Sequence, residues 1–151
     1  ARLLELLRAG APSGTLFLMT ADHGQIATPR DPNLELRNHL PFVEMLAMLP
    51  SGEQRLPYLF LRPGRQEEAA AYVEEHWPGQ FRMVSAERLL ASGLLGPGEV
   101  YSRLPSRLGD AVLIPQGNAY LWWGQGDNPL LGRHGAFSPE EMLVPFFALE
   151  M

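Results

Sequence analysis

Thr15-Leu16-Phe17-Leu18-Met19-Thr20-Ala21-Asp22-His23-Gly24 is the stretch that decides the fold of this chain. Its run of apolar residues covers both faces of an extended segment, which predicts a buried strand of a parallel sheet. Open α/β sheets carry their chemistry just beyond the carboxyl ends of such strands. Asp22 and His23 stand at that position, and Gly24 allows the backbone to turn away and leave them exposed. Both residue types are ligands for divalent metals, so this strand end is a candidate metal site, with a chance occurrence of the motif as the alternative.

The composition is that of a globular domain. The chain has 151 residues, of which 46% are hydrophobic and 19% charged. The net charge of −5 argues against a nucleic-acid-binding surface. With no cysteine, a metal would have to be held by Asp, Glu, His or backbone oxygen. No apolar run is long enough for a membrane segment.

The beginning of the chain is already helical in pattern. Residues 2–9 alternate leucines with charged residues and carry neither an initiator Met nor an N-cap residue. We expect the chain to be a piece of a longer protein, with a processed mature end as the alternative.

The middle of the chain reads as a small inserted subdomain. After a short helix over 41–49, the pattern predicts alternating strands and helices. These elements are a strand over 56–61, a helix over 66–76, a strand over 81–84 and a helix over 86–92 capped by Ser85. We therefore assign residues 53–127 to an inserted, cap-like α/β subdomain, and residues 1–52 and 128–151 to the C-terminal part of a catalytic core.

The later part of the chain predicts three further features. Residues 107–115 and 119–123 read as the two strands of a hairpin. Ser138 and Glu141 have the spacing of a capping box at a short helix. Residues 144–149 read as a final buried strand.

His134 is the second candidate ligand. It lies between Gly132 and Gly135, in a loop that precedes the start of a helix, and such a histidine is free to point into a site. Together with Asp22 and His23 it provides the donor types that Zn, or alternatively Mn, prefers. His39 and His76 are expected to be solvated surface residues.

Two segments of the sequence resemble a known family. Thr20-Ala21-Asp22-His23-Gly24, and Gly132-Arg133-His134-Gly135 followed by Ser138 to Pro145, resemble the alkaline phosphatase superfamily. The similarity is greatest to its type I phosphodiesterase/nucleotide pyrophosphatase branch. The resemblance implies a fold, namely part of an α/β/α core with an inserted cap. It also implies two divalent metals a few ångströms apart, with Asp22 and His23 on one and His134 on the other.

The resemblance further implies that this chain holds only part of such a site. In that family the Ser or Thr nucleophile and the other ligands precede the Asp-His-Gly motif, but residues 1–21 contain no Asp and no His. We therefore expect the C-terminal portion of a phosphodiesterase or phosphatase, inactive alone, whose intact form takes a small phosphate ester or nucleotide. An unpaired sheet edge would also favour a homodimer.

Two other interpretations remain open. Cofactor-independent phosphoglycerate mutase belongs to the same superfamily and resembles the chain at Ala21 to Gly24 and at the late His and Val-Pro pair. However, Gln25-Ile26-Ala27 departs from the Asn and acid that usually continue its motif. The third interpretation is a non-catalytic α/β binding module.

Overall fold

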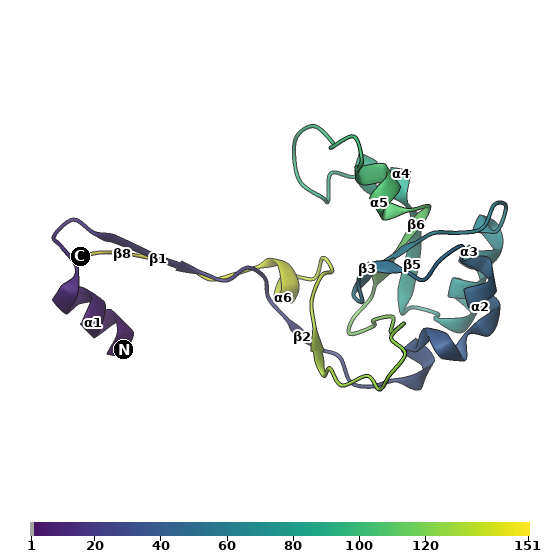
Figure 1. Ribbon diagram of the computed structural model, residues 1–151, viewed down its shortest axis with the longest axis horizontal. Helices are drawn as coiled ribbons and strands as arrows, with labels where there is room; N and C mark the ends of the chain where they lie inside the picture. The colour runs from purple at the N-terminus through teal and green to yellow at the C-terminus, as the bar shows by residue number, and fades with distance from the viewer. Residues whose placement is uncertain (1) are drawn as a thin grey trace.

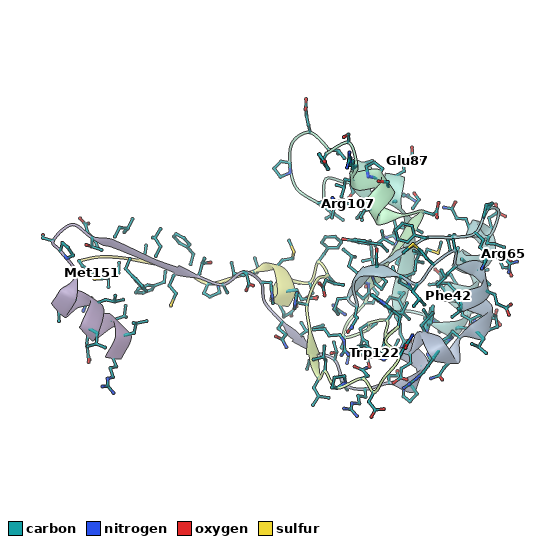
Figure 2. The ribbon with its side chains drawn as sticks, in the orientation of Figure 1. Phe42, Arg65, Glu87, Arg107, Trp122 and Met151 are labelled. Carbon is teal, nitrogen blue, oxygen red and sulfur yellow. The ribbon has the colours of Figure 1, made fainter. Side chains whose placement is uncertain are left out.

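The molecule consists of a compact lobe and a long arm (Figure 1). The structure is a computed structural model that describes residues 2–151. The lobe holds the middle of the chain, and the arm is formed by its two ends. Met151 lies at the far end of the arm, whereas Phe42 lies inside the lobe (Figure 2). Among residues 2–151, no helix is long and apolar enough to cross a membrane.

The arm is a two-stranded antiparallel ribbon with a helix at its end (Figure 1). Its elements are α1 (Arg2–Gly10), β1 (Leu16–Thr20) and β8 (Phe146–Glu150). Leu16 faces Glu150 across the ribbon, and Thr20 faces Phe146. The prediction of a strand after the first helix is therefore confirmed.

The prediction that β1 and β8 are buried, and that β1 lies in a parallel sheet, is wrong for this chain. The two strands pair antiparallel, and Leu18 and Phe146 are 54% and 71% exposed. A strand that is apolar on both faces is buried only when other layers cover both faces. Residues 2–151 provide β1 with one neighbouring strand and no covering layer.

The lobe is built on a four-stranded antiparallel sheet with the strand order β3-β4-β6-β5. Its strands are β3 (Ser51–Glu53), β4 (Leu56–Leu59), β5 (Phe81–Ser85) and β6 (Ala111–Pro115). Because successive side chains of a strand point to opposite faces, β6 contributes to two cores. Ala111 and Leu113 pack with Trp77 on one face, and Val112 packs with Leu108 on the other.

Helices cover both faces of this sheet, which makes the lobe a three-layer α/β/α unit (Figure 1). The helices are α2 (Leu40–Met45) and α3 (Gln66–His76) on one face, and α4 (Ala86–Ala91) and α5 (Leu104–Leu108) on the other. The predicted helix over 66–76 is confirmed, and so is the cap of α4, where Ser85 Oγ accepts a hydrogen bond from Arg88 N–H.

The larger core begins before the first strand of the lobe. Two 3₁₀ helices, η1 (Pro32–Leu34) and η2 (Leu36–Asn38), place Leu34 and Leu36 in the same apolar cluster as α2 and α3. The division of the chain at residues 52 and 127 stays a prediction.

Three predicted elements differ in the structure. The helix expected over 41–49 ends at Met45, because Leu46 is extended. Residues 104–108 form α5, so the strand begins at Ala111. The hairpin is absent: β6 pairs with β4 and β5, while the backbone of residues 121–122 hydrogen-bonds to Gln54 and Leu34.

His39 is buried, so the prediction of a solvated loop residue is wrong. Its Nε2–H donates to the Asn33 carbonyl at 2.8 Å, and Nδ1 lies 2.9 Å from the Tyr72 hydroxyl. The 3₁₀ turns fold this segment back onto α3, which buries the ring. Burial lowers the pKa of His39, and the nearby His76 lowers it further, although the bond to Asn33 opposes both. His76 itself is exposed, as expected.

Candidate functional site

The two halves of the candidate site are joined by a short pair of strands. β2 (Ile26–Ala27) follows the Asp-His-Gly motif, and β7 (Gly132–Arg133) precedes His134. They pair antiparallel, with Ile26 opposite Arg133. This register brings the loop around His23 beside His134, although 110 positions separate the two residues in the sequence.

The structure places the rings of His23 and His134 against each other. Their centroids are 3.5 Å apart and their planes differ by 15°. His23 Nδ1 lies 2.7 Å from the carbonyl of Gly24, which can only accept. The proton is therefore on Nδ1, and Nε2 keeps its lone pair for another partner.

Asp22 lies at the open side of this pair. Its Oδ2 is 3.6 Å from His23 Nε2, and its side chain is 88% exposed. The structure thus brings the three sequence-predicted residues together. They do not form a ready-made metal centre, since residues 2–151 contain no group of three or more such side chains arranged to hold an ion.

Gly24 is required for close packing and not for a turn. Its N–H donates to the Glu141 carbonyl at 2.8 Å, on α6 (Pro139–Met142). A Cβ at Gly24 would lie 1.8 Å from the carbonyl oxygen of Glu140, and no positive φ is involved. The sequence identified the glycine correctly, but the physical reason is the approach of a helix to the backbone.

The predicted capping box at α6 is wrong. Ser138 is the N-cap residue but makes no side-chain cap. The Glu141 carboxylate instead accepts from Arg55 Nε at 3.0 Å and Nη2 at 2.7 Å, and from the Ala136 N–H at 3.0 Å. A buried guanidinium outcompetes the Ser138 amide for this carboxylate, since charged, bidentate hydrogen bonds are the strongest available.

Arg55 and Glu141 form a buried ion pair between the lobe and α6. Their side chains are 2% and 1% exposed. Burial by itself raises the pKa of Glu141, but the bonds from Arg55 and Ala136 outweigh it, and the net pKa is lowered. Arg55 also donates to the carbonyls of Gly117 and Ala119. Nothing in the local sequence pattern identified Arg55.

Arg133 fastens the His134 loop to the lobe. Its guanidinium carbon lies 3.9 Å from the centre of the Tyr120 ring, a cation–π geometry. It also donates to Gln54 Oε1 at 2.5 Å, to Thr28 Oγ1 at 2.7 Å and to Asn128 Oδ1. The residue directly before the candidate ligand is therefore buried and fully engaged.

A cavity of about 280 Å³ opens beside His134. Most of the side chains around it are polar. They are Gln25, Glu53, Gln54, Leu130, Arg133 and His134, together with the backbone of Gly132. Because Glu53 and Gln54 belong to the lobe, the lobe and the loops of the two histidines form this cavity together.

The fold is similar to that of part of an ectonucleotide pyrophosphatase/phosphodiesterase and part of a phosphonoacetate hydrolase. No protein-family model and no curated protein matches the chain, so the similarity rests on solved structures. Human ectonucleotide pyrophosphatase/phosphodiesterase 5 aligns with a TM-score of 0.63 and 16% identity, over 97% of this chain and 37% of its own. An inactive form of the murine protein in complex with AMP aligns with a TM-score of 0.61 and 17% identity, over the same shares of both chains.

A third solved structure aligns with this chain over a similar share of its own length. Phosphonoacetate hydrolase from Sinorhizobium meliloti, in complex with phosphonoformate, aligns with a TM-score of 0.62 and 21% identity, over 97% of this chain and 38% of its own. The chain therefore spans less than two fifths of the proteins that it matches. The fold implied by the Asp-His-Gly motif and His134 is confirmed, and the similarity includes the lobe.

Proposed function

We propose that this chain supplies part of the two-metal site of a phosphoric ester hydrolase. Asp22 and His23 bind one divalent metal, and His134 binds the other. The observation that carries the proposal is the contact between His23 and His134 in this fold. The neighbouring structures include phosphodiesterases and a hydrolase of a phosphonate, which supports phosphorus chemistry as the shared activity.

The donor set fits zinc, with manganese as the alternative, because it consists of two imidazoles and one carboxylate. The ring geometry favours two ions over one. A nitrogen ligand directs its lone pair in the plane of its ring, with Zn–N of about 2.0–2.1 Å. Two nearly parallel rings 3.5 Å apart cannot both direct lone pairs at a single ion without tilting. Neighbouring ions, one for each ring, agree with this arrangement.

Each residue has a definite role in this proposal. The Gly24 carbonyl holds the proton of His23 on Nδ1, which leaves Nε2 as the donor atom. The exposed Asp22 carboxylate adds negative charge beside Nε2. A bound metal pair would stabilise the charge that develops on phosphoryl oxygens and lower the pKa of a nucleophile. The polar cavity at His134 would receive the remainder of a small phosphate ester or nucleotide.

Zinc titration followed by histidine NMR tests the proposal. Zinc should shift the ring signals of His23 and His134, with an affinity weaker than micromolar because each ion lacks further protein ligands. H134A should lose the shift at its own site and weaken the response of His23. H76A is the matched control, since His76 is exposed on α3. A zinc response that spares both His23 and His134 would contradict the proposal and favour a non-catalytic module.

The 151-residue chain should not hydrolyse bis-p-nitrophenyl phosphate on its own. Residues 1–21 provide hydroxyls only at Ser13, Thr15 and Thr20, and no Asp or His accompanies them. A spectrophotometric assay with zinc or manganese checks this expectation. Turnover by the purified chain that disappears in H134A would overturn it.

A further inference from the structure

One buried side chain lies between the two histidine-bearing loops. Glu141 touches the first loop through its backbone carbonyl, which accepts the Gly24 N–H directly after His23. It touches the second through its carboxylate, whose Oε1 accepts the Ala136 N–H, two residues after His134. Both contacts come from the same turn of α6, so the position of this turn fixes the two loops relative to each other.

The carboxylate is itself held from the lobe. Arg55 lies in the two-residue turn between β3 and β4 and contacts Glu141 with two nitrogens. The other terminal nitrogen of Arg55 donates to Gly117 O at 2.9 Å and to Ala119 O. The guanidinium therefore cannot move without breaking four hydrogen bonds. This arrangement ties α6 to the β3–β4 turn and to the loop that follows β6.

The His23 loop has no comparable side-chain anchor near its ring, whereas Arg133 also ties the His134 loop to the lobe. β2 and β7 have two residues each, and the His23 ring contacts the backbone only at Gly24. Because Gly24 packs directly against the Glu140 carbonyl, a displacement of α6 moves the backbone beside His23. A displacement also pulls on Ala136 and the loop of His134.

We propose that Glu141 and Arg55 are positioning residues that hold His23 and His134 in contact for metal binding. The inference rests on the proposed function, and it assigns a role to the lobe in the same site. The lobe supplies the cation that fixes the helix, and the helix fixes both ligand loops. The function of the ion pair is then to position α6 and not to stabilise the fold, because a buried ion pair contributes little net stability compared with apolar residues.

The decisive variant is the double substitution R55M/E141L. It removes both charges together, so no buried charge is left without a partner, and the chain should stay folded. In the metal-free protein, the NOE between the ring protons of His23 and His134 should disappear. The zinc affinity measured at these histidines should fall about 10- to 100-fold, the range seen when outer partners of metal ligands are removed.

Two further variants separate geometry from general folding. E141Q keeps an oxygen acceptor for the Ala136 N–H and should retain the NOE, with zinc binding between the wild type and the double variant. E87Q is the control, because Glu87 is exposed on α4 (Figure 2) and should leave both readouts unchanged. A folded R55M/E141L protein with wild-type NOE and zinc binding would refute the role of the pair.

The NOE does not depend on metal, so the two proposals can fail separately. If zinc leaves both histidines of the wild type unaffected while the double variant loses the NOE, the two-metal proposal fails and the positioning role stands. If zinc binds at both histidines and the double variant responds identically, the positioning role fails and the two-metal proposal stands.

Discussion

At the scale of single residues, the site depends on groups that act through backbone atoms. Gly24 is required for a steric reason: the Glu140 carbonyl occupies the space that any Cβ would need. Glu141 links two loops through one carbonyl and one carboxylate. Residue type alone is enough to identify Asp22, His23 and His134 as candidates, because aspartate and histidine are common metal ligands. It misses Arg55, whose importance comes entirely from burial and from partners distant in the sequence.

Gly24→Ala should destabilise the protein and disturb the His23 loop. The added methyl would lie 1.8 Å from the Glu140 oxygen, so α6 or the loop has to shift. Overpacking of this kind costs about 1–3 kcal/mol. Urea unfolding measures the loss, and the NOE between His23 and His134 should weaken. Gly126→Ala is the control, because nothing lies within 4 Å of a Cβ there. Equal stability of the two variants would show that the close approach to α6 is unimportant.

At the scale of elements, local patterns predicted helices better than strand pairing. The helix over Gln66–His76 and the Ser85 cap of α4 depend on neighbours in the sequence, and both are confirmed. The hairpin over residues 107–123 was wrong because apolar strands separated by a turn need not pair with each other. Here β6 lies in the sheet between β4 and β5, and both partners are distant from it in the sequence. His39 was misjudged for the same reason, since α3 buries it.

His39 should make the stability of the lobe dependent on pH. Burial lowers its pKa below the ordinary value of 6.5, so the unfolded chain binds more protons than the folded chain. The stability that the neutral His39 contributes is fully present above pH 6.5. It is lost as the pH falls from 6.5 through the pKa that His39 has in the folded protein. NMR titration of the folded protein should place the midpoint of the His39 titration below pH 6.5. The free energy of unfolding should decline between pH 7 and pH 5 more steeply than in H39Q. A His39 that titrates at or above 6.5 would contradict this.

At the scale of the whole molecule, the arm is the unusual feature. Its two strands pair only with each other, as Figure 1 shows, and they expose large apolar side chains. These residues are Leu16, Leu18, Met19, Phe146 and Phe147. The sequence predicted a buried position for both strands, and their composition agrees with that. The sequence of a strand does not show whether another layer of the protein covers it. Burial depends on the atoms that surround a strand as well as on the strand itself.

The isolated chain should therefore self-associate through the arm. Exposed apolar strands with unpaired edges are templates for pairing with another copy. Sedimentation velocity from micromolar to hundreds of micromolar should show a concentration-dependent dimer. Phe146→Lys should shift the equilibrium towards the monomer. Leu131→Lys, which replaces an equally exposed leucine outside the arm, should not. A strictly monomeric protein over this range would argue against association.

The pairing of β2 with β7 has a consequence for how such proteins can diversify. Ala27 of β2 lies opposite Gly132 of β7, so the residues between these two points form a cassette with adjoining ends. A cassette of this kind can change in length or be exchanged for another while β1 stays in register with β8. A replacement that keeps the histidine loops together has to reproduce the pair Arg55–Glu141 and the hydrogen bonds that Arg133 makes to Gln54, Thr28 and Asn128.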